Sequence, residues 1–228
     1  MNLDVTATVA RLREESERRA TELPAEPDDP HREDRLRRAY LAAVGFGRRY
    51  QSPDWVQVAP AVGDKLRPYC DALAQHVTAG EGATLIGGVG TGKTHALALI
   101  ALAARGLSLP LREDGIPRLV DARYVFSPDL YDALFETRNP DAQERMRGWR
   151  DCDLLLLDDA DRIYGVDFAV SRFEAFVEHR HGDLRATCIS CNAGDVFNDP
   201  KFSRTVDRWR ETTAVRIEFG DKSRRGAR

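Results

Sequence analysis

The chain has 228 residues, a formal net charge of −3, 42% apolar residues and 31% charged residues, the balance of an ordinary globular protein. No apolar run approaches the roughly 20 residues that span a bilayer, and the first twenty residues become charged too early for a secretory signal. We therefore expect a cytoplasmic protein with no membrane partner. The slightly acidic total excludes a global basic field, so any contact with nucleic acid would need a local patch.

The N-terminal region differs from the rest of the chain. Two amphipathic helices are predicted, at 5–23 and 31–46, with the linker PAEPDDP between them. Their apolar stripes consist of Val5, Val9 and Leu12 in the first helix and Leu36, Tyr40 and Val44 in the second. The pair either packs on the main domain or docks a partner. We interpret residues 1–58 as a helical partner-binding region with its linker, and residues 59–228 as the main domain.

From about residue 60 the sequence alternates between helices and apolar strands, which predicts an α/β fold with a doubly wound parallel sheet between layers of helices. Five strands are predicted, at 83–87, 118–126, 153–158, 185–191 and 213–219. Helices are predicted at 65–80, 93–106, 127–137, 167–181 and 199–211. The stretch GLSLPLREDGIPR, at 106–118, is longer than the fold needs and indicates either a surface hairpin or a partner contact.

The stretch GGVGTGKTH follows the first of these strands and opens a helix. It fits the pattern G-x-x-x-x-G-K-[ST], whose glycines let successive backbone N–H groups point at phosphates. The lysine can reach the β- and γ-phosphates and the threonine hydroxyl can ligate Mg²⁺, so we expect ATP with Mg²⁺ here. The predicted nucleotide-binding residues are Gly87, Gly88, Val89, Gly90, Thr91, Gly92, Lys93, Thr94 and His95.

The strand DLLLLDDAD ends in carboxylates at the edge where open α/β sheets bind ligands. Asp158 suits the Mg²⁺ site, together with Thr94, and Asp159 is placed to polarise an attacking water. We interpret Asp161 as a turn or helix-cap residue. Asn192 ends the next strand and is predicted to orient the same water beside the γ-phosphate. A solvated acidic turn and a plain turn asparagine are the alternatives.

Cys188 and Cys191 form a CxxC, but they lie within an alternating strand pattern and would not converge on a metal. We expect buried strand cysteines rather than a zinc or redox site.

Two groups of arginines are candidates for contacts with other molecules. Arg204 and Arg208 share one face of a late helix, where they either act on the nucleotide of a neighbouring subunit or form ion pairs with Asp207 and Glu211. The first alternative, action on a neighbouring subunit, assumes that the chain has few spare cations near the phosphates of its own nucleotide. A second group could bind DNA, with an aromatic side chain to stack on bases, or could be a solvated helix face: Arg138, Arg145, Arg147 and Arg150, with Trp149.

The segments LIGGVGTGKTHALALIA, LLLLDDAD, CISCN and SRTVDRW occur here in the order found in the bacterial helicase loaders of the DnaC/DnaI type. The transposition helper ATPases of the IstB type share this order, and both groups are AAA+ ATPases. The chain resembles them over roughly residues 46 to 225. The resemblance implies an AAA+ P-loop NTPase with a five-stranded sheet and, since the chain ends after the last strand, no C-terminal helical lid.

The resemblance also implies roles. Lys93 and Thr94 would bind phosphate and Mg²⁺, Asp158 the metal, and Asp159 would be the catalytic carboxylate. Asn192 would be the sensor, and Arg208, with Arg204 beside it, the arginine finger through which subunits associate. The implied partners are a hexameric replicative DNA helicase and single-stranded DNA, with ATP hydrolysed during loading.

Three other functions remain open from the sequence. One is an IstB-like transposition helper that acts on duplex DNA. Another is a nucleotide-gated binding module with negligible turnover, because an aspartate at 159 reaches less far than a glutamate would. The last is a small-molecule phosphotransferase, which would need a substrate lid and an acceptor site that the sequence does not indicate.

Overall fold

The computed structural model describes residues 29–109, 118–162, 167–192, 200–220 and 223. The chain divides into two compact units, Met1–Arg35 and Leu36–Arg228. The helix predicted at 5–23 lies outside the described residues. The helix predicted at 31–46 is α2 (Arg32–Val44), which crosses the boundary between the units. The sheet and the predicted site lie in the second unit, and the partner-binding role of residues 1–58 stays a prediction.

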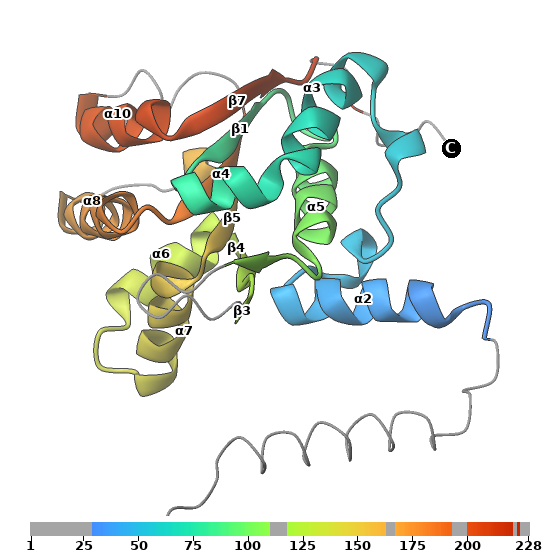
Figure 1. Ribbon diagram of the computed structural model, residues 1–228. Coiled ribbons are helices and arrows are strands. Elements are labelled where there is room, and N and C mark those ends of the chain that lie inside the picture. Colours follow the sequence, from blue (N-terminus) through green and yellow to red (C-terminus); the bar gives the residue numbers. More distant parts are fainter. Residues whose placement is uncertain (1–28, 110–117, 163–166, 193–199, 221–222, 224–228) are drawn as a thin grey trace, which may run out of the picture. The chain divides into compact units, whose positions relative to one another are not determined.

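The sheet of the second unit has five parallel strands in the order β4-β5-β6-β1-β7 (Figure 1). The strands are β1 (Gly82–Ile86), β4 (Ala122–Phe126), β5 (Leu154–Asp158), β6 (Ala186–Cys191) and β7 (Thr213–Glu218). All five overlap predicted strands, and the doubly wound α/β fold is confirmed. The strand predicted at 118–126 is too long, because only Ala122–Phe126 joins this sheet and Arg118–Leu119 pairs in a separate two-stranded sheet. Because the strands are parallel, the loop after β1 and the ends of β5 and β6 meet at one edge of the sheet.

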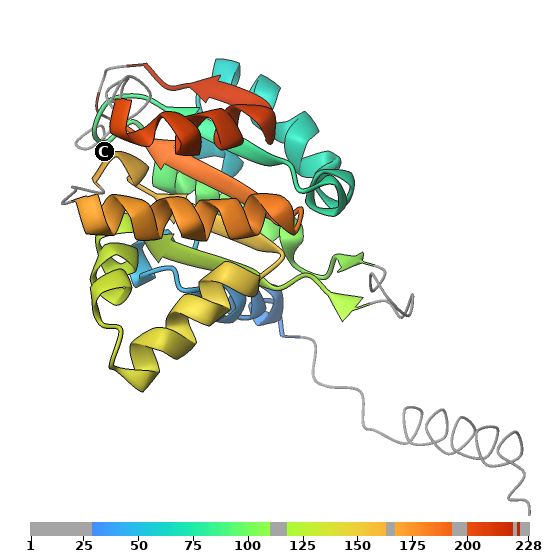
Figure 2. The same ribbon diagram turned by 90° about the vertical axis from the view of Figure 1, so that its left-hand side faces the viewer.

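Helices cover both faces of the sheet (Figures 1 and 2). One face packs against α2, α3 (Pro60–Asp71), α4 (Leu73–Ala79) and α5 (Lys93–Ala104). The other face is covered by α6 (Ser127–Phe135), α7 (Pro140–Asp151), α8 (Asp167–Gly182) and α10 (Ser203–Glu211). The leucine run of β5 supplies both cores in alternation, with Leu154 and Leu156 in the first and Leu155 and Leu157 in the second. This alternation is why an uninterrupted apolar strand folds here.

The structure corrects two helix predictions. The helix predicted at 65–80 is two helices, α3 and α4, because the backbone leaves the helical region at Ala72 (φ −97°, ψ 11°). The predicted glycine end is confirmed at Gly80, which closes α4 in the left-handed conformation (φ 77°). In α2, the apolar stripe predicted through Leu36, Tyr40 and Val44 is only partly buried, because Leu36 is 44% exposed and the buried residues are Leu41 and Val44.

The two ends of the long stretch at 106–118 pair with each other as the strands of a hairpin. Short strands β2 (Ser108–Leu109) and β3 (Arg118–Leu119) pair antiparallel, and Arg118 forms a bidentate ion pair with Asp153 at the start of β5. The residues between the two strands lie outside the described part of the chain.

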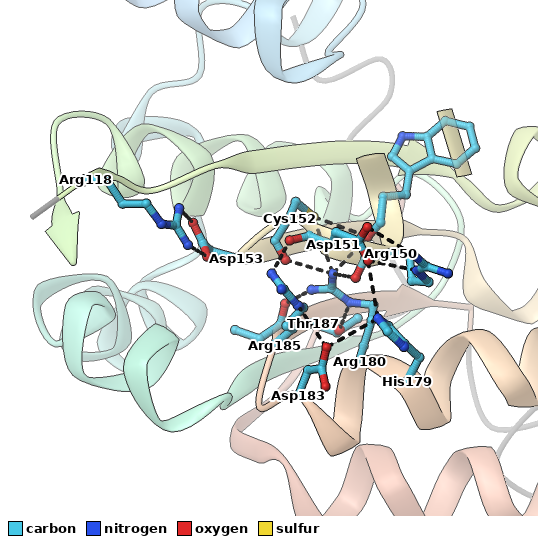
Figure 3. A network of polar contacts seen from close by, with 12 residues as sticks. Arg118, Arg150, Asp151, Cys152, Asp153, His179, Arg180, Asp183, Arg185 and Thr187 are labelled. Carbon is cyan, nitrogen blue, oxygen red and sulfur yellow. Dashed lines mark hydrogen bonds and ion pairs between the residues drawn. The ribbon is translucent and has the colours of Figure 1, made fainter. Parts of the chain in front are cut away.

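A buried arginine forms hydrogen bonds with several segments of the second face, at the edge where β5 and β6 begin (Figure 3). Arg180 of α8 is 2% exposed and donates to the carbonyl oxygens of Trp149 (2.8 Å), Arg150 (3.0 Å) and Cys152 (2.9 Å). It also donates to the Ala186 carbonyl and to Thr187 Oγ1. One guanidinium thus satisfies the end of α7 and the first residues of β6, where the chain would otherwise leave buried carbonyls unpaired.

Among the residues that the structure describes, no helix is long and apolar enough to cross a bilayer. Cys188 and Cys191 are free and buried, as predicted, and burial raises the pKa of Cys191 to about 12.

Candidate nucleotide-binding site

The loop between β1 and α5 holds its shape through glycines. Gly90 (φ 79°) and Gly92 (φ 108°) adopt left-handed backbone conformations that a side chain would strain. At Gly87 the limit is space, because a Cβ atom would lie 2.4 Å from the carbonyl oxygen of Phe219, the residue after β7. The glycines of the motif are therefore needed for the turn and for the close approach of two strand ends.

Lys93 begins α5 and is buried, with 6% of its surface exposed. Its Nζ donates to the carbonyl oxygens of Gly87 (2.7 Å) and Gly88 (2.9 Å) and to Asn192 Oδ1 (3.0 Å). Burial lowers the pKa of Lys93, and the carboxylates of Asp159 and Asp158 oppose that shift. Because all three hydrogen-bond partners of this ammonium are neutral, the site fits an incoming anionic phosphate.

The next residue, Thr94, connects the loop to β5. Its hydroxyl donates to Asp158 Oδ2 at 2.8 Å, and Tyr124 of β4 donates to the same oxygen at 3.0 Å. Ser190 of β6 donates to the other carboxylate oxygen. The structure thus brings together the hydroxyl and the carboxylate predicted for Mg²⁺, and oxygen donors of this kind fit that ion.

Asp159 follows β5 with a left-handed backbone (φ 51°), and its N–H donates to Ser190 Oγ at 3.0 Å. Burial raises the pKa of Asp159, and the neighbouring carboxylates of Asp158 and Asp161 raise it further. The side chain lines the same pocket as the loop, where a carboxylate could act on a bound water.

Asn192 and Asp161 are directly connected. Asp161 accepts hydrogen bonds from the backbone N of Asn192 (3.0 Å) and from its side-chain Nδ2 (3.1 Å). Interpreting Asp161 only as a turn or cap residue missed this contact, because nothing local in the sequence relates it to a residue 31 positions later.

These residues surround an open pocket of about 1010 Å³, large enough for a nucleotide. Its lining includes the loop from Val89 to His95, Asp158, Asp159 and Asn192. Gly87 and Gly88 do not line it, and their carbonyls bind Lys93 instead. The segment before α3 also contributes, and His95 Nε2 lies 2.9 Å from the carbonyl oxygen of Asp54 in that segment.

Two cations in the pocket correct a premise of the sequence analysis. Arg49 and Arg162 both line it, so the chain does place positive charges near its own site. Arg162 lies 3.9 Å from Asp159 Oδ2. Neither arginine was predicted as a site residue, and the fold brings both of them to the loop.

Arg204 and Arg208 lie on α10 and do not line the pocket. Arg208 donates to Glu178 of α8 (3.0 Å) and to Glu211 (3.2 Å), and Arg210 pairs with Asp207. The ion pairs with acidic neighbours on this helix were the predicted alternative. Any contact of Arg208 with phosphate would therefore be with the site of another subunit.

The second group of predicted cations lies on α7 or just before it. Arg138, Arg145 and Arg147 are exposed, and Arg150 pairs with Asp151. Trp149 is half-buried and packs against the core formed with α6, α8 and α10, so its ring is partly committed to the fold.

No protein-family model matches the sequence, and no curated protein is similar to it. Solved structures do share its fold. DnaI is 18% identical with a TM-score of 0.58, over 77% of this chain and 95% of that chain. The DnaC helicase loader is 17% identical with a TM-score of 0.56, over 76% and 99%. The replication initiator DnaA bound to AMPPCP and single-stranded DNA is 20% identical with a TM-score of 0.54, over 82% of this chain and 52% of that chain.

The chain therefore spans about half of the DnaA chain but nearly all of the solved DnaC and DnaI chains. Identities of this size carry the fold and not the partners or the reaction. The parallel sheet order, the glycine loop after β1 and the carboxylates after β5 agree with that likeness. The chain has the P-loop NTPase fold of the AAA+ type, the fold of the DnaC and DnaI helicase loaders.

Proposed function

We propose that this protein is an ATP-dependent loader of a hexameric replicative DNA helicase, acting in the cytoplasm. It binds ATP with Mg²⁺, assembles on the helicase and on single-stranded DNA, and hydrolyses ATP during loading. The observation that carries the proposal is the pair of contacts from the loop, Lys93 to Asn192 and Thr94 to Asp158, in the fold of the DnaC and DnaI loaders.

Each of these groups has a part in the proposed reaction. Lys93 leaves its carbonyl partners to bind the β- and γ-phosphates, and the loop N–H groups hold the remaining oxygens. Thr94 and Asp158 would hold Mg²⁺, which supplies positive charge to the phosphates when it is bound. Asp159 accepts a proton from the attacking water, and Asn192 orients that water.

The partner contacts are assigned by charge and position. Arg208, with Arg204 beside it, acts on the nucleotide of a neighbouring subunit, because neither reaches the pocket of its own chain. Arg49 and Arg162 supplement it from within the same chain. The exposed arginines of α7 contact the DNA backbone, and residues 1–58 bind the helicase.

One observation favours a second candidate, a nucleotide-gated binding module. The Asp159 side chain reaches less far toward an attacking water than a glutamate would, and its Oδ2 lies 3.9 Å from Arg162, an ion-pair partner that competes with that water. Such a module would bind ATP through the same loop but turn it over negligibly.

The test is ATP binding and turnover by the full chain, alone and with a replicative helicase and single-stranded or duplex DNA. Lys93→Ala removes the buried ammonium, and Lys65→Ala removes an exposed lysine of α3 as the matched control. We expect weak turnover alone, stimulation by helicase with single-stranded DNA, and loss of both binding and turnover only in Lys93→Ala.

The other outcomes separate the alternatives. If duplex DNA stimulates turnover and the helicase has no effect, the protein is an IstB-like transposition helper and not a helicase loader. Tight ATP binding that no partner converts to turnover would leave the nucleotide-gated module. If Lys93→Ala binds ATP as well as the unsubstituted chain does, the proposal that this loop is the nucleotide site is wrong.

A further inference from the structure

The side chain of Asn192 lies between two charged groups that fix its orientation. Its Oδ1 accepts from Lys93 Nζ at 3.0 Å, and its Nδ2 donates to Asp161 Oδ2 at 3.1 Å. An ammonium can only donate and an ionised carboxylate can only accept, so the amide must turn its oxygen to Lys93 and its NH₂ to Asp161. The assignment of the two amide atoms follows from chemistry.

Asp161 also holds the backbone of the same residue. Its Oδ1 accepts from the backbone N of Asn192 at 3.0 Å, directly after β6 ends at Cys191. The carboxylate reaches this position from a 3-10 turn (Ala160–Arg162) that follows the left-handed residue Asp159. One carboxylate therefore accepts from both nitrogen atoms of Asn192, and the residue is held at its backbone and its side chain.

In this orientation the Asn192 side chain is poorly placed to hydrogen-bond to a terminal phosphate. Phosphate oxygens only accept hydrogen bonds, so Asn192 must present its NH₂ to them, and here the NH₂ is bound to Asp161. The group turned toward the phosphate-binding lysine is the amide oxygen. To donate to a γ-phosphate from the position where Oδ1 now faces Lys93, the amide must turn over, and its NH₂ then leaves a carboxylate, which is a strong acceptor.

We propose that Asp161 is a positioning residue that holds the Asn192 amide away from the terminal phosphate and so weakens the preference for nucleoside triphosphate over diphosphate. The inference rests on the proposed nucleotide site and deepens it. Asp161 sets how strongly the site distinguishes ATP from ADP, acting through Asn192 and not by touching nucleotide itself.

The test compares ATP and ADP affinities of the full chain with Asp161→Asn. The new amide keeps an oxygen for the backbone N–H of Asn192, but its own NH₂ opposes the Asn192 NH₂, which is then free to turn. Because the amide no longer has a carboxylate to leave, we expect the ratio of ATP to ADP affinity to rise by about tenfold. Asp161→Ala removes both acceptors and should change the ratio in the same direction.

A double-mutant cycle separates this effect from simple loss of negative charge. In an Asn192→Ala background no amide remains to be released, so Asp161→Asn should leave the affinity ratio unchanged. An equal rise in both backgrounds would mean that charge alone is responsible and would overturn the inference, as would an unchanged ratio in the parent chain.

The same measurements separate this inference from the proposed function. If the parent chain binds both nucleotides and Lys93→Ala binds neither, the nucleotide site stands whatever Asp161→Asn does. If the parent chain binds neither nucleotide, the proposed function fails and the inference fails with it.

Discussion

The hydroxyl of Tyr124 donates a hydrogen bond of 3.0 Å to Asp158 Oδ2, the same oxygen that accepts the hydroxyl hydrogen of Thr94 at 2.8 Å. The tyrosine ring packs on Phe46, with the ring centroids 4.2 Å apart. Burial raises the pKa of Tyr124, and the neighbouring Asp158 raises it further, so the hydroxyl keeps its proton and stays a donor. The carboxylate proposed for Mg²⁺ is therefore held from two strands and a helix.

Tyr124→Phe should raise the Mg²⁺ concentration needed for half-maximal nucleotide binding by several-fold, because the ring stays packed while Asp158 loses one donor. A hydrogen bond to a charged group is worth roughly 1.5–3 kcal/mol, and Thr94 and Ser190 retain part of the alignment. The measurement is a Mg²⁺ titration with a fluorescent ATP analogue. Tyr131→Phe, on α6 and outside the pocket, is the control. Superimposable titrations of the two variants would contradict a role for the hydroxyl.

Asp159→Asn should stabilise the protein at neutral pH. The folded-state pKa of Asp159 is raised by burial and by Asp158 and Asp161, so its charge destabilises the fold above that pKa. As pH falls through the raised pKa toward the ordinary aspartate value of about 3.9, the parent protonates and the advantage of the amide disappears. The measurement is thermal unfolding of Asp159→Asn and of the parent chain, and their stabilities are compared at pH 7.5 and at acid pH.

The control for this pH dependence is Glu144→Gln, an exposed acid on α7. It should show no comparable gain at neutral pH. A stabilisation by Asp159→Asn that is the same size at both pH values would argue that packing, and not charge, is responsible.

Arg180→Met should destabilise the fold by about 3 kcal/mol or more, because methionine fills the space but leaves several buried carbonyl oxygens without a donor. Urea unfolding followed by circular dichroism measures the change. Arg147→Met, an exposed position on α7, should change the free energy of unfolding by less than about 0.5 kcal/mol. Similar values for both variants would show that the Arg180 contacts contribute nothing specific.

Arg208→Ala should bind ATP like the parent chain but lose turnover, because Arg208 lies outside the pocket of its own chain. If it acts on a neighbouring subunit, mixing Arg208→Ala with Lys93→Ala should restore part of the activity, since each supplies what the other lacks. Arg210→Ala, from the same helix, is the control. Full turnover by Arg208→Ala alone would reduce its role to the ion pairs with Glu178 and Glu211.

The sequence by itself determined the fold class and half of the site. The run of leucines at 154–157 predicts a strand covered on both faces, and the glycines of the loop mark a backbone that side chains would obstruct. These features depend on a few neighbouring residues, so they are legible without the tertiary structure. Because parallel strands end at one edge, the sequence also predicted that Asn192 lies beside the phosphate-binding loop, where the structure shows it in contact with Lys93.

Only the tertiary structure decided which further groups reach that edge. Tyr124, Arg49 and Arg162 line the pocket but were not predicted as site residues, and Asp161, interpreted as a turn or helix-cap residue, contacts Asn192. The break at Ala72 and the burial of Arg180 were equally hidden. The physical reason is that such contacts join side chains from separate elements, and their partners are set by how helices and strands pack. Local sequence encodes the backbone of the loop and its motif residues, whereas packing decides which other side chains reach the pocket.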